Sequence, residues 1–254
     1  MISLRNIFFL IQISLISSCS LQFKYREHTD HFEQEIQKLE ELKDHLEKED
    51  YSTSEIEIFD AAEQFLGRTS NLMKILITHT PEIARWWLGF LVSIRQDGLG
   101  SNSDVKLRGL ACVKTSMTNE CNYCTSHTSI YAQGLGYSEQ QIALIEDNEY
   151  KDSDKFTTKE KLAIEWAEAV TLNKALNDGP LWDSLRDNFS DAEIVEITLA
   201  SSMFNMINRL NDTFRSELET TDFNKKQWDA TGILPLDAQE AFASRFSEQK
   251  FVKR

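Results

Sequence analysis

Apolar residues recur at three- and four-residue intervals along most of this chain, while strand-like alternation is scarce. Glycine and proline, which interrupt helices, number only nine and three among 254 residues. The sequence therefore predicts an all-α fold with one sizeable core. The net charge of −14 argues against binding to nucleic acid, because phosphates need a basic surface.

The first 18 residues have the pattern of an export signal. Arg5 precedes an apolar run over Ile7–Ile16 that is too short for a comfortable transmembrane helix. The segment Ile16-Ser17-Ser18-Cys19 resembles a bacterial lipobox, which implies that Cys19 is lipidated and becomes the mature N-terminus. We expect a lipid-anchored protein of the bacterial cell envelope, on the periplasmic or outer face. A plain signal peptide is the alternative, and either one places the domain where disulfides persist.

The sequence predicts that the chain divides into four segments. A signal peptide (1–18) is followed by a charged linker or helix (19–50), a helical domain (51–222) and a polar tail (223–254). Within 22–50 one narrow apolar stripe predicts an amphipathic helix, which packs on its own domain, pairs with a second subunit or acts as a stalk. The stripe consists of Phe32, Ile36, Leu39, Leu42 and Leu46. Between 55 and 95 we expect three helices, broken near 67–70 and at Pro81.

A pair of cysteines and a histidine stand close together in Glu120-Cys121-Asn122-Tyr123-Cys124-Thr125-Ser126-His127. The pattern predicts a helix start, where a CxxC pair has its sulfurs near enough to form a small disulfide. The helix N-terminus and a nearby imidazole both favour a thiolate. Since thiolate is the reactive form of cysteine, the segment predicts a redox site.

Cys112 lies in an apolar helical stretch, so we interpret it as a buried structural thiol. The alternative makes it a third redox or metal thiol. A zinc site built from Cys112, Cys121, Cys124 and His127 is disfavoured, because ligands at successive three-residue steps on one helix turn away from a common centre. We expect neither a metal nor a cofactor.

Three ordered motifs resemble the carboxymuconolactone decarboxylase and alkyl hydroperoxidase D-like superfamily, in its peroxidase-related branch. They span roughly residues 55–218. The motifs are Cys121-Asn122-Tyr123-Cys124 with His127 and Gly134-Leu135-Gly136; Phe156–Ala163 with Trp166–Ala169; and Asn188–Ile197 leading to Phe204–Asp212. The resemblance implies an all-helical alkyl hydroperoxidase D-like fold that assembles as homo-oligomers.

For function, the resemblance implies a thiol peroxidase or disulfide reductase. Cys124 would attack peroxide to give a sulfenic acid, and Cys121 would resolve it to a disulfide that an external thiol reduces. The sequence itself leaves the order open, since the first cysteine is the nucleophile in thioredoxin-like CxxC proteins. Lactone decarboxylation is disfavoured, because those enzymes do not depend on a CxxC pair.

The chain departs from the family pattern at two positions. The relay glutamate usually stands twelve residues before the first cysteine, and that position here is Gly109, although the preceding Arg108 matches. The histidine usually falls at the position of Thr128, one residue after His127. At roughly 100° per residue, His127 lies about 60° from Cys124, so it still neighbours Cys124 but moves away from Cys121. The alternative is a histidine packed or hydrogen-bonded within an oligomer.

Two functions follow from these patterns. The first is an extracytoplasmic, membrane-anchored thiol oxidoreductase that acts on peroxides or disulfides through Cys124, Cys121 and His127. The second is a non-catalytic structural or interaction lipoprotein in which the two cysteines form a stable disulfide. The absent relay glutamate and the amphipathic segment favour the second function.

Overall fold

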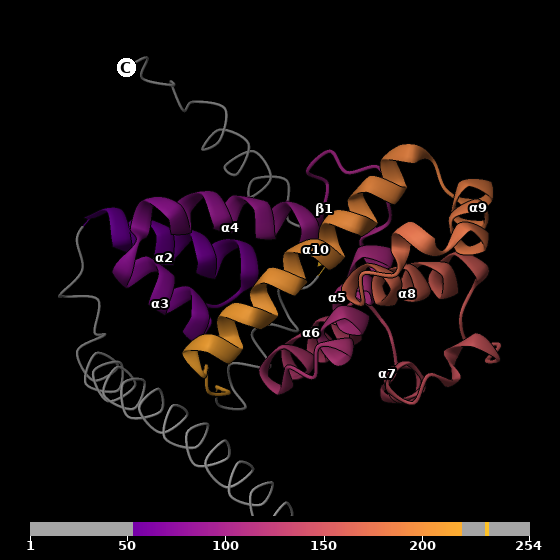
Figure 1. Cartoon of the computed structure of the whole chain (residues 1–254). Coiled ribbons are helices and arrows are strands. Elements are labelled where there is room, and N and C mark those ends of the chain that lie inside the picture. The colour runs from indigo at the N-terminus through magenta and orange to yellow at the C-terminus, as the bar shows by residue number, and fades with distance from the viewer. Residues whose placement is uncertain (1–52, 220–231, 234–254) are drawn as a thin grey trace, which may run out of the picture. The chain divides into compact units, whose positions relative to one another are not determined.

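Nine α-helices make up nearly all of the regular structure in the part of the chain that the computed structural model describes, residues 53–219 and 232–233 (Figure 1). The expected signal peptide, Cys19, the 22–50 helix and nearly all of the 223–254 tail lie outside these residues. The helices are α2 (Thr53–Leu66), α3 (Asn71–His79), α4 (Pro81–Arg95), α5 (Val105–Thr118), α6 (Asn122–Gly134), α7 (Glu139–Glu146), α8 (Thr158–Thr171), α9 (Gly179–Asn188) and α10 (Asp191–Phe214).

Two short 3₁₀ turns and a small strand pair complete the described elements. The turns are η2 (Glu149–Lys151) and η3 (Ala175–Asn177), and β1 (Gln96–Asp97) pairs in parallel with β2 (Gly232–Ile233). The all-α prediction is therefore confirmed, and so are the helix breaks near 67–70 and at Pro81. No helix within the described ranges has the length and apolar character needed to cross a membrane.

Local capping residues set most of the helix starts. The side chains of Ser138, Thr157 and Ser190 accept hydrogen bonds from backbone N–H groups one turn into α7, α8 and α10, and each forms a full capping box. Gly136 has φ +99°, a left-handed conformation that few other residues adopt, and it ends the turn after α6.

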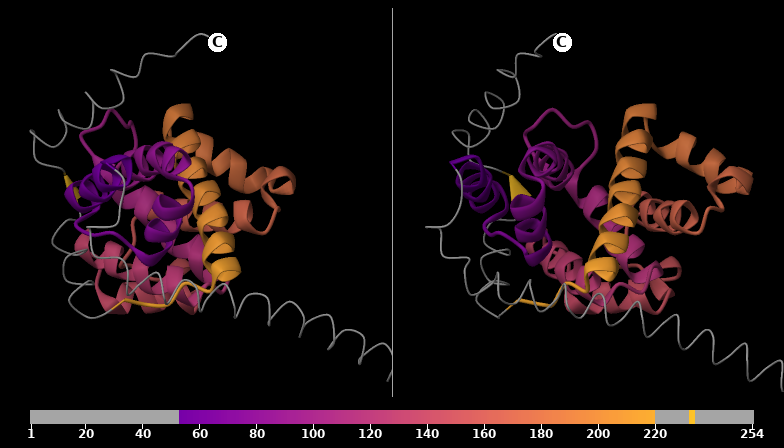
Figure 2. Two further views of the ribbon diagram at one scale, coloured as in Figure 1. Left: turned by 90° about the vertical axis from the view of Figure 1, so that its left-hand side faces the viewer. Right: turned by 60° about the vertical axis from the view of Figure 1, so that its left-hand side comes forward.

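The long helix α10 crosses the molecule between α2–α4 on one side and α8–α9 on the other (Figures 1 and 2). It packs mainly against α5 and α8 and also contacts α3, α4, α6 and α9. Helix α5 is buried along most of its length, since it packs against α6, α8 and α10. These contacts bring the start of α6 against the last turns of α10.

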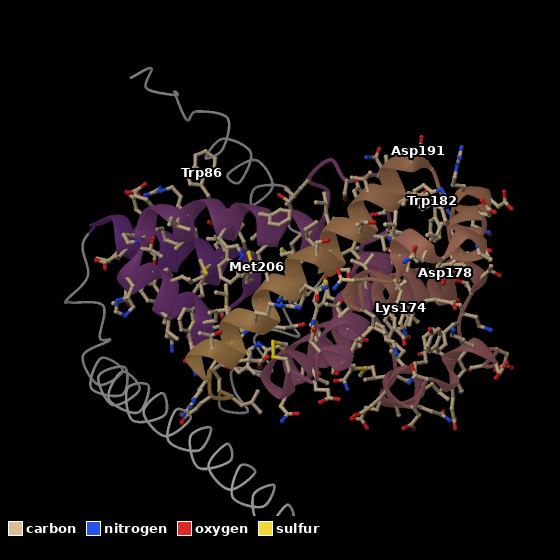
Figure 3. The ribbon with its side chains drawn as sticks, in the orientation of Figure 1. Trp86, Lys174, Asp178, Trp182, Asp191 and Met206 are labelled. Carbon is tan, nitrogen blue, oxygen red and sulfur yellow. A yellow bond between two sulfur atoms is a disulfide. The ribbon has the colours of Figure 1, made fainter. Side chains whose placement is uncertain are left out.

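The aromatic residues of α4 divide between the core and the surface. Trp87 packs against the core, whereas Trp86 is 52% exposed and Phe90 is 37% exposed. Figure 3 shows Trp86 on the outer side of α4, and Met206 and Trp182 also remain exposed.

Candidate redox site

Cys121 and Cys124 stand at the start of α6 and are joined by a disulfide. Cys121 is the N-cap residue, and its Sγ accepts the backbone N–H of Cys124 at 3.4 Å. The Cα atoms of the pair are 5.3 Å apart. The predicted helix start is confirmed, and it directs the positive end of the α6 dipole toward the sulfurs.

Both sulfur-bearing residues are buried in the larger of two core clusters. Cys121 is 1% exposed and Cys124 is 2% exposed. Asn211, in the last turns of α10, donates a hydrogen bond from Nδ2 to Cys124 Sγ at 3.4 Å. A polar side chain from a distant part of the sequence therefore reaches one sulfur of the pair.

His127 is buried on α6, one turn beyond Cys124, and its ring nitrogens are hydrogen-bonded to two charged residues. Arg68 donates from Nη2 to Nδ1 at 2.9 Å, and Nε2 lies 2.8 Å from Glu219 Oε2. The imidazole also stacks on Tyr123, with 4.2 Å between ring centroids. The histidine thus has a packed, hydrogen-bonded setting within one chain, and its catalytic role stays a prediction.

Glu219 belongs to the short segment that follows α10, and it joins three parts of the molecule. Its Oε1 accepts a hydrogen bond from the Asn71 backbone N–H at 2.7 Å and another from the Tyr123 hydroxyl at 2.6 Å. Asn71 Nδ2 also donates to the carbonyl oxygen of Glu217 at 2.9 Å. These bonds tie the segment to the start of α3 and to α6.

Burial and pairing set the charges of the Arg68–His127–Glu219 chain. Burial lowers the pKa of His127 to about 4, although the hydrogen bond to Glu219 opposes this shift. Burial raises the pKa of Glu219, but hydrogen bonds from His127, Tyr123 and the Asn71 backbone outweigh it and lower that pKa to about 2. Burial and the nearby Arg95 lower the pKa of Arg68 to about 9. At pH 7 a neutral imidazole therefore lies between a cation and an anion, with Nε2–H donating to Glu219 and Nδ1 accepting from Arg68.

A side chain at the position of the usual family glutamate would require neighbouring side chains to shift. A Cβ atom added to Gly109 would lie 2.6 Å from Leu135 Cδ1 and 3.3 Å from Tyr131 Cε1. Glu120, the carboxylate nearest in sequence to the pair, is exposed and has φ +57°. The carboxylate beside His127 is Glu219 instead.

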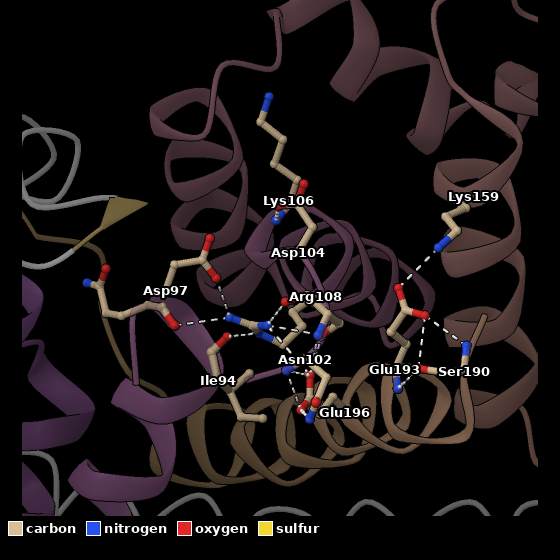
Figure 4. A network of polar contacts seen from close by, with 12 residues as sticks. Ile94, Asp97, Asn102, Asp104, Lys106, Arg108, Lys159, Ser190, Glu193 and Glu196 are labelled. Atoms are coloured by element: carbon tan, nitrogen blue, oxygen red, sulfur yellow. Dashed lines mark hydrogen bonds and ion pairs between the residues drawn. The ribbon is translucent and has the colours of Figure 1, made fainter. Parts of the chain in front are cut away.

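Arg108, which matches the family pattern, is 1% exposed and is fully engaged in joining α4, α5 and α10 (Figure 4). Its guanidinium donates to the carbonyl oxygens of Ile94, Gln96 and Ser103, to Ser103 Oγ and to Asp97 Oδ1, and it lies 3.8 Å from Glu196 Oε2. This environment indicates a structural role for Arg108.

Cys112 is a free, fully buried thiol, as predicted. Burial raises its pKa to about 12, so it is protonated at neutral pH. Across the described residues, no three His, Cys, Asp or Glu side chains come together in a group that could hold a metal ion.

Sequence reasoning missed Arg68, Asn211 and Glu219. They lie 59, 87 and 92 residues from the α6 partner that each contacts. Arg68 was part of a predicted helix break, Asn211 fell within a family motif, and Glu219 lies just beyond the 55–218 span of the motifs. None of them has a local pattern that indicates its partner.

Comparison with curated proteins finds two uncharacterised bacterial relatives. YdfG of Bacillus subtilis strain 168 is 24% identical over 132 residues, covering 51% of this chain and 88% of the relative. YnjA of Escherichia coli K12 is 27% identical over 136 residues, covering 50% of this chain and 73% of the relative. No family model matches the chain.

Solved structures share the fold. The debrominase Bmp8 superposes with a TM-score of 0.59 at 22% identity, over 73% of this chain and 95% of Bmp8. A peroxidase-related protein from Silicibacter sp. TM1040 gives 0.60 at 18% identity, over 70% of this chain and 91% of that one. A putative antioxidant defence protein AhpD from Agrobacterium tumefaciens gives 0.50 at 26% identity, over 56% of this chain and 94% of that one. Together with the CxxC pair, the likeness to this putative antioxidant defence protein suggests a redox role.

Proposed function

We propose that the chain, which shares the fold of carboxymuconolactone decarboxylase and alkyl hydroperoxidase D-like proteins, belongs to that superfamily and is a thiol-dependent peroxidase that uses Cys121 and Cys124. The observation that carries the proposal is the redox pair at the start of α6, with Cys121 as the N-cap residue and Asn211 on Cys124 Sγ. A helix N-terminus and hydrogen-bond donors both favour the thiolate form.

The Arg68–His127–Glu219 row supports the proposal because it holds an imidazole on the helix of the pair, one turn beyond Cys124, and a carboxylate against that imidazole. His127 lies one turn from Cys124 on α6, and Glu219 is hydrogen-bonded to both His127 and Tyr123. We propose that Glu219 takes the place of the absent family glutamate by orienting His127. In this role His127 and Glu219 are positioning residues, and Cys121 and Cys124 perform the chemistry.

The proposed reaction begins with the reduced pair. The Cys124 thiolate attacks the terminal oxygen of a hydroperoxide, so an S–O bond forms while the O–O bond breaks and the alkoxide takes a proton from water. The Cys121 sulfur then attacks the Cys124 sulfenic acid, an S–S bond forms, and the hydroxyl leaves as water with the Cys121 proton. Two electrons from an external thiol donor restore the pair, so peroxide is reduced and the donor is oxidised.

The location and assembly of the enzyme are also part of the proposal. The export pattern of 1–18 and Cys19 favour lipid anchoring in the cell envelope, where the domain would work as a homo-oligomer. The partners would be a peroxide substrate and an external thiol reductant.

A structural disulfide is the second candidate function. The burial of both sulfurs, at 1% and 2% exposure, favours it because buried pairs are shielded from external thiols. The two functions differ in how easily the disulfide is reduced.

Stopped-flow mixing of the reduced full-length chain with hydrogen peroxide and with an organic hydroperoxide tests the first function. Free thiols are counted by mass spectrometry. We expect rapid loss of two thiols in the wild type and in the matched control Cys112→Ala, and no rapid phase in Cys124→Ser. Slow oxidation at the same rate in all three proteins would overturn the proposal.

A further inference from the structure

Asn211 occupies the end of a polar row on the inner side of α10. Ser201, Asn205, Asn208 and Asn211 follow one another at helical spacing. The first three bond mainly to neighbouring α5 and α8 side chains, such as Thr115, Thr171 and Ser116. Asn211 differs, because its amide nitrogen bonds to the sulfur of Cys124.

The orientation of the Asn211 amide is fixed by a second hydrogen bond. Nδ2 donates both to Cys124 Sγ at 3.4 Å and to the Ile207 carbonyl oxygen at 3.1 Å. The opposite orientation would place Oδ1 against that carbonyl, and two acceptors would face each other. The donor end of the amide therefore points at the sulfur.

The other end of the amide has no partner among the described residues. Asn211 is 3% exposed, and its Oδ1 is buried without a hydrogen bond. A buried acceptor without a partner costs free energy, and a donor that reaches it removes that cost. Here the acceptor belongs to the same amide that holds the reactive sulfur.

On this basis, and resting on the proposed peroxidase function, we propose that Asn211 is a catalytic residue that binds the Cys124 thiolate through Nδ2 and the O–H of the hydroperoxide through Oδ1. The thiolate is a stronger acceptor than the disulfide sulfur, so the Nδ2 bond strengthens when the pair is reduced. The hydroperoxide supplies the O–H donor that Oδ1 lacks. When sulfur attacks that oxygen, the hydrogen stays on it in the sulfenic acid and remains bound to Oδ1.

Cys121 has a different donor. Its sulfur accepts the backbone N–H of Cys124 at 3.4 Å, a bond supplied by the helix itself. Replacing Asn211 should therefore affect Cys124 and leave Cys121 unchanged. The two residues are almost equally buried, so a selective effect would reflect chemistry and not access.

The test compares two reagents on reduced full-length protein. Iodoacetamide needs only the thiolate, whereas an organic hydroperoxide also offers an O–H group to Oδ1. In Asn211→Leu we expect Cys124 alkylation at pH 7 to slow by about tenfold, as a lost hydrogen bond to a charged group predicts. We expect its reaction with the hydroperoxide to slow by at least a further tenfold, with Cys121 alkylation unchanged by residue-resolved mass spectrometry.

Asn208→Leu is the matched control, because it removes a buried amide one turn away that bonds to Ser116 and Asn119 and not to sulfur. It should leave the Cys124 rates unchanged. If the leucine variant does not fold, Asn211→Asp keeps the shape and replaces the donor with an anion, so it should slow both reactions of Cys124 more strongly. If neither variant folds, the hydrogen-exchange rate of the Asn211 side-chain amide is measured in the wild type with the pair oxidised and with the pair reduced. We expect slower exchange in the reduced protein.

Equal rates in wild type and Asn211 variants, or an equal slowing with both reagents, would overturn the inference. An Asn211 amide hydrogen-exchange rate that is the same in the oxidised and reduced proteins would also overturn it. Failure of the wild-type pair to react with hydroperoxide would instead overturn the proposed function itself.

Discussion

Nε2 of His127 lies 2.8 Å from Oε2 of Glu219, a residue 92 positions further along the chain. This contact connects the redox helix α6 to the segment that follows α10, and Arg68 extends it on the other side of the imidazole. A cation, a neutral ring and an anion thus form one buried row that is anchored on the helix of the CxxC pair.

Replacing Glu219 by Gln should destabilise the fold, because the buried Arg68 cation loses its balancing anion. We expect the free energy of unfolding at pH 7 to fall by about 3 kcal/mol, the range seen when one partner of a buried ion pair is removed. Urea unfolding followed by tryptophan fluorescence measures it. Glu217→Gln is the control, since that side chain is exposed on the same segment; an equal loss in both variants would contradict the role assigned to Glu219.

Stability should decrease as the pH falls below 6.5. The pKa of His127 is about 4 in the folded protein and about 6.5 unfolded, so the unfolded chain binds the proton first. The free energy of unfolding should drop by about 3 kcal/mol between pH 6.5 and 4. The lowered pKa of Glu219 adds a further loss between pH 4.5 and 2.

Urea unfolding at a series of pH values tests this dependence. His127→Gln should flatten the slope between pH 6.5 and 4, whereas replacing the exposed His79 by Gln should leave it unchanged. A wild-type slope that persists in His127→Gln would show that other groups cause the acid sensitivity.

Restoring the family glutamate should not restore a relay. In Gly109→Glu the new side chain would enter the packed contact with Leu135 and Tyr131, and its carboxylate would be buried. We expect a loss of about 3 kcal/mol in the free energy of unfolding, with no gain in peroxide turnover. Lys106→Glu, at an exposed position of the same helix, should fold normally; a Gly109→Glu protein with wild-type stability and faster turnover would refute this prediction.

Arg108 should matter for folding and not for redox chemistry. Arg108→Met leaves Asp97 and several carbonyl oxygens without their donor, so we expect a loss of about 3 to 5 kcal/mol. Thermal unfolding measures the loss. The rate at which the folded fraction reacts with hydroperoxide should equal that of the wild type, and a selectively slower reaction would place Arg108 in the site.

Local features of the fold were predictable from sequence, and long-range pairings were not. Ser138, Thr157 and Ser190 signal helix starts because each is recognised from the three residues that follow it. The buried state of Cys112 followed from its apolar helical surroundings. Glu219 and Asn211 reach α6 only because α10 packs back against α5 and α6. No local pattern in the sequence indicates that packing.

The contact between Glu219 and His127 is another long-range pairing that the sequence does not indicate. From sequence, Gly109 indicated that the family carboxylate was absent. The structure places Glu219 against His127 through a segment whose position depends on Asn71 and Tyr123.

The reduction potential of the Cys121–Cys124 pair in the full-length protein tests the central claim most directly. Equilibration with defined ratios of reduced and oxidised dithiothreitol, with thiols trapped and counted by mass spectrometry, gives the value. A redox-active pair should have a potential between about −270 and −120 mV, the span of catalytic dithiols. A potential below about −300 mV would identify a structural disulfide and contradict the proposed enzyme.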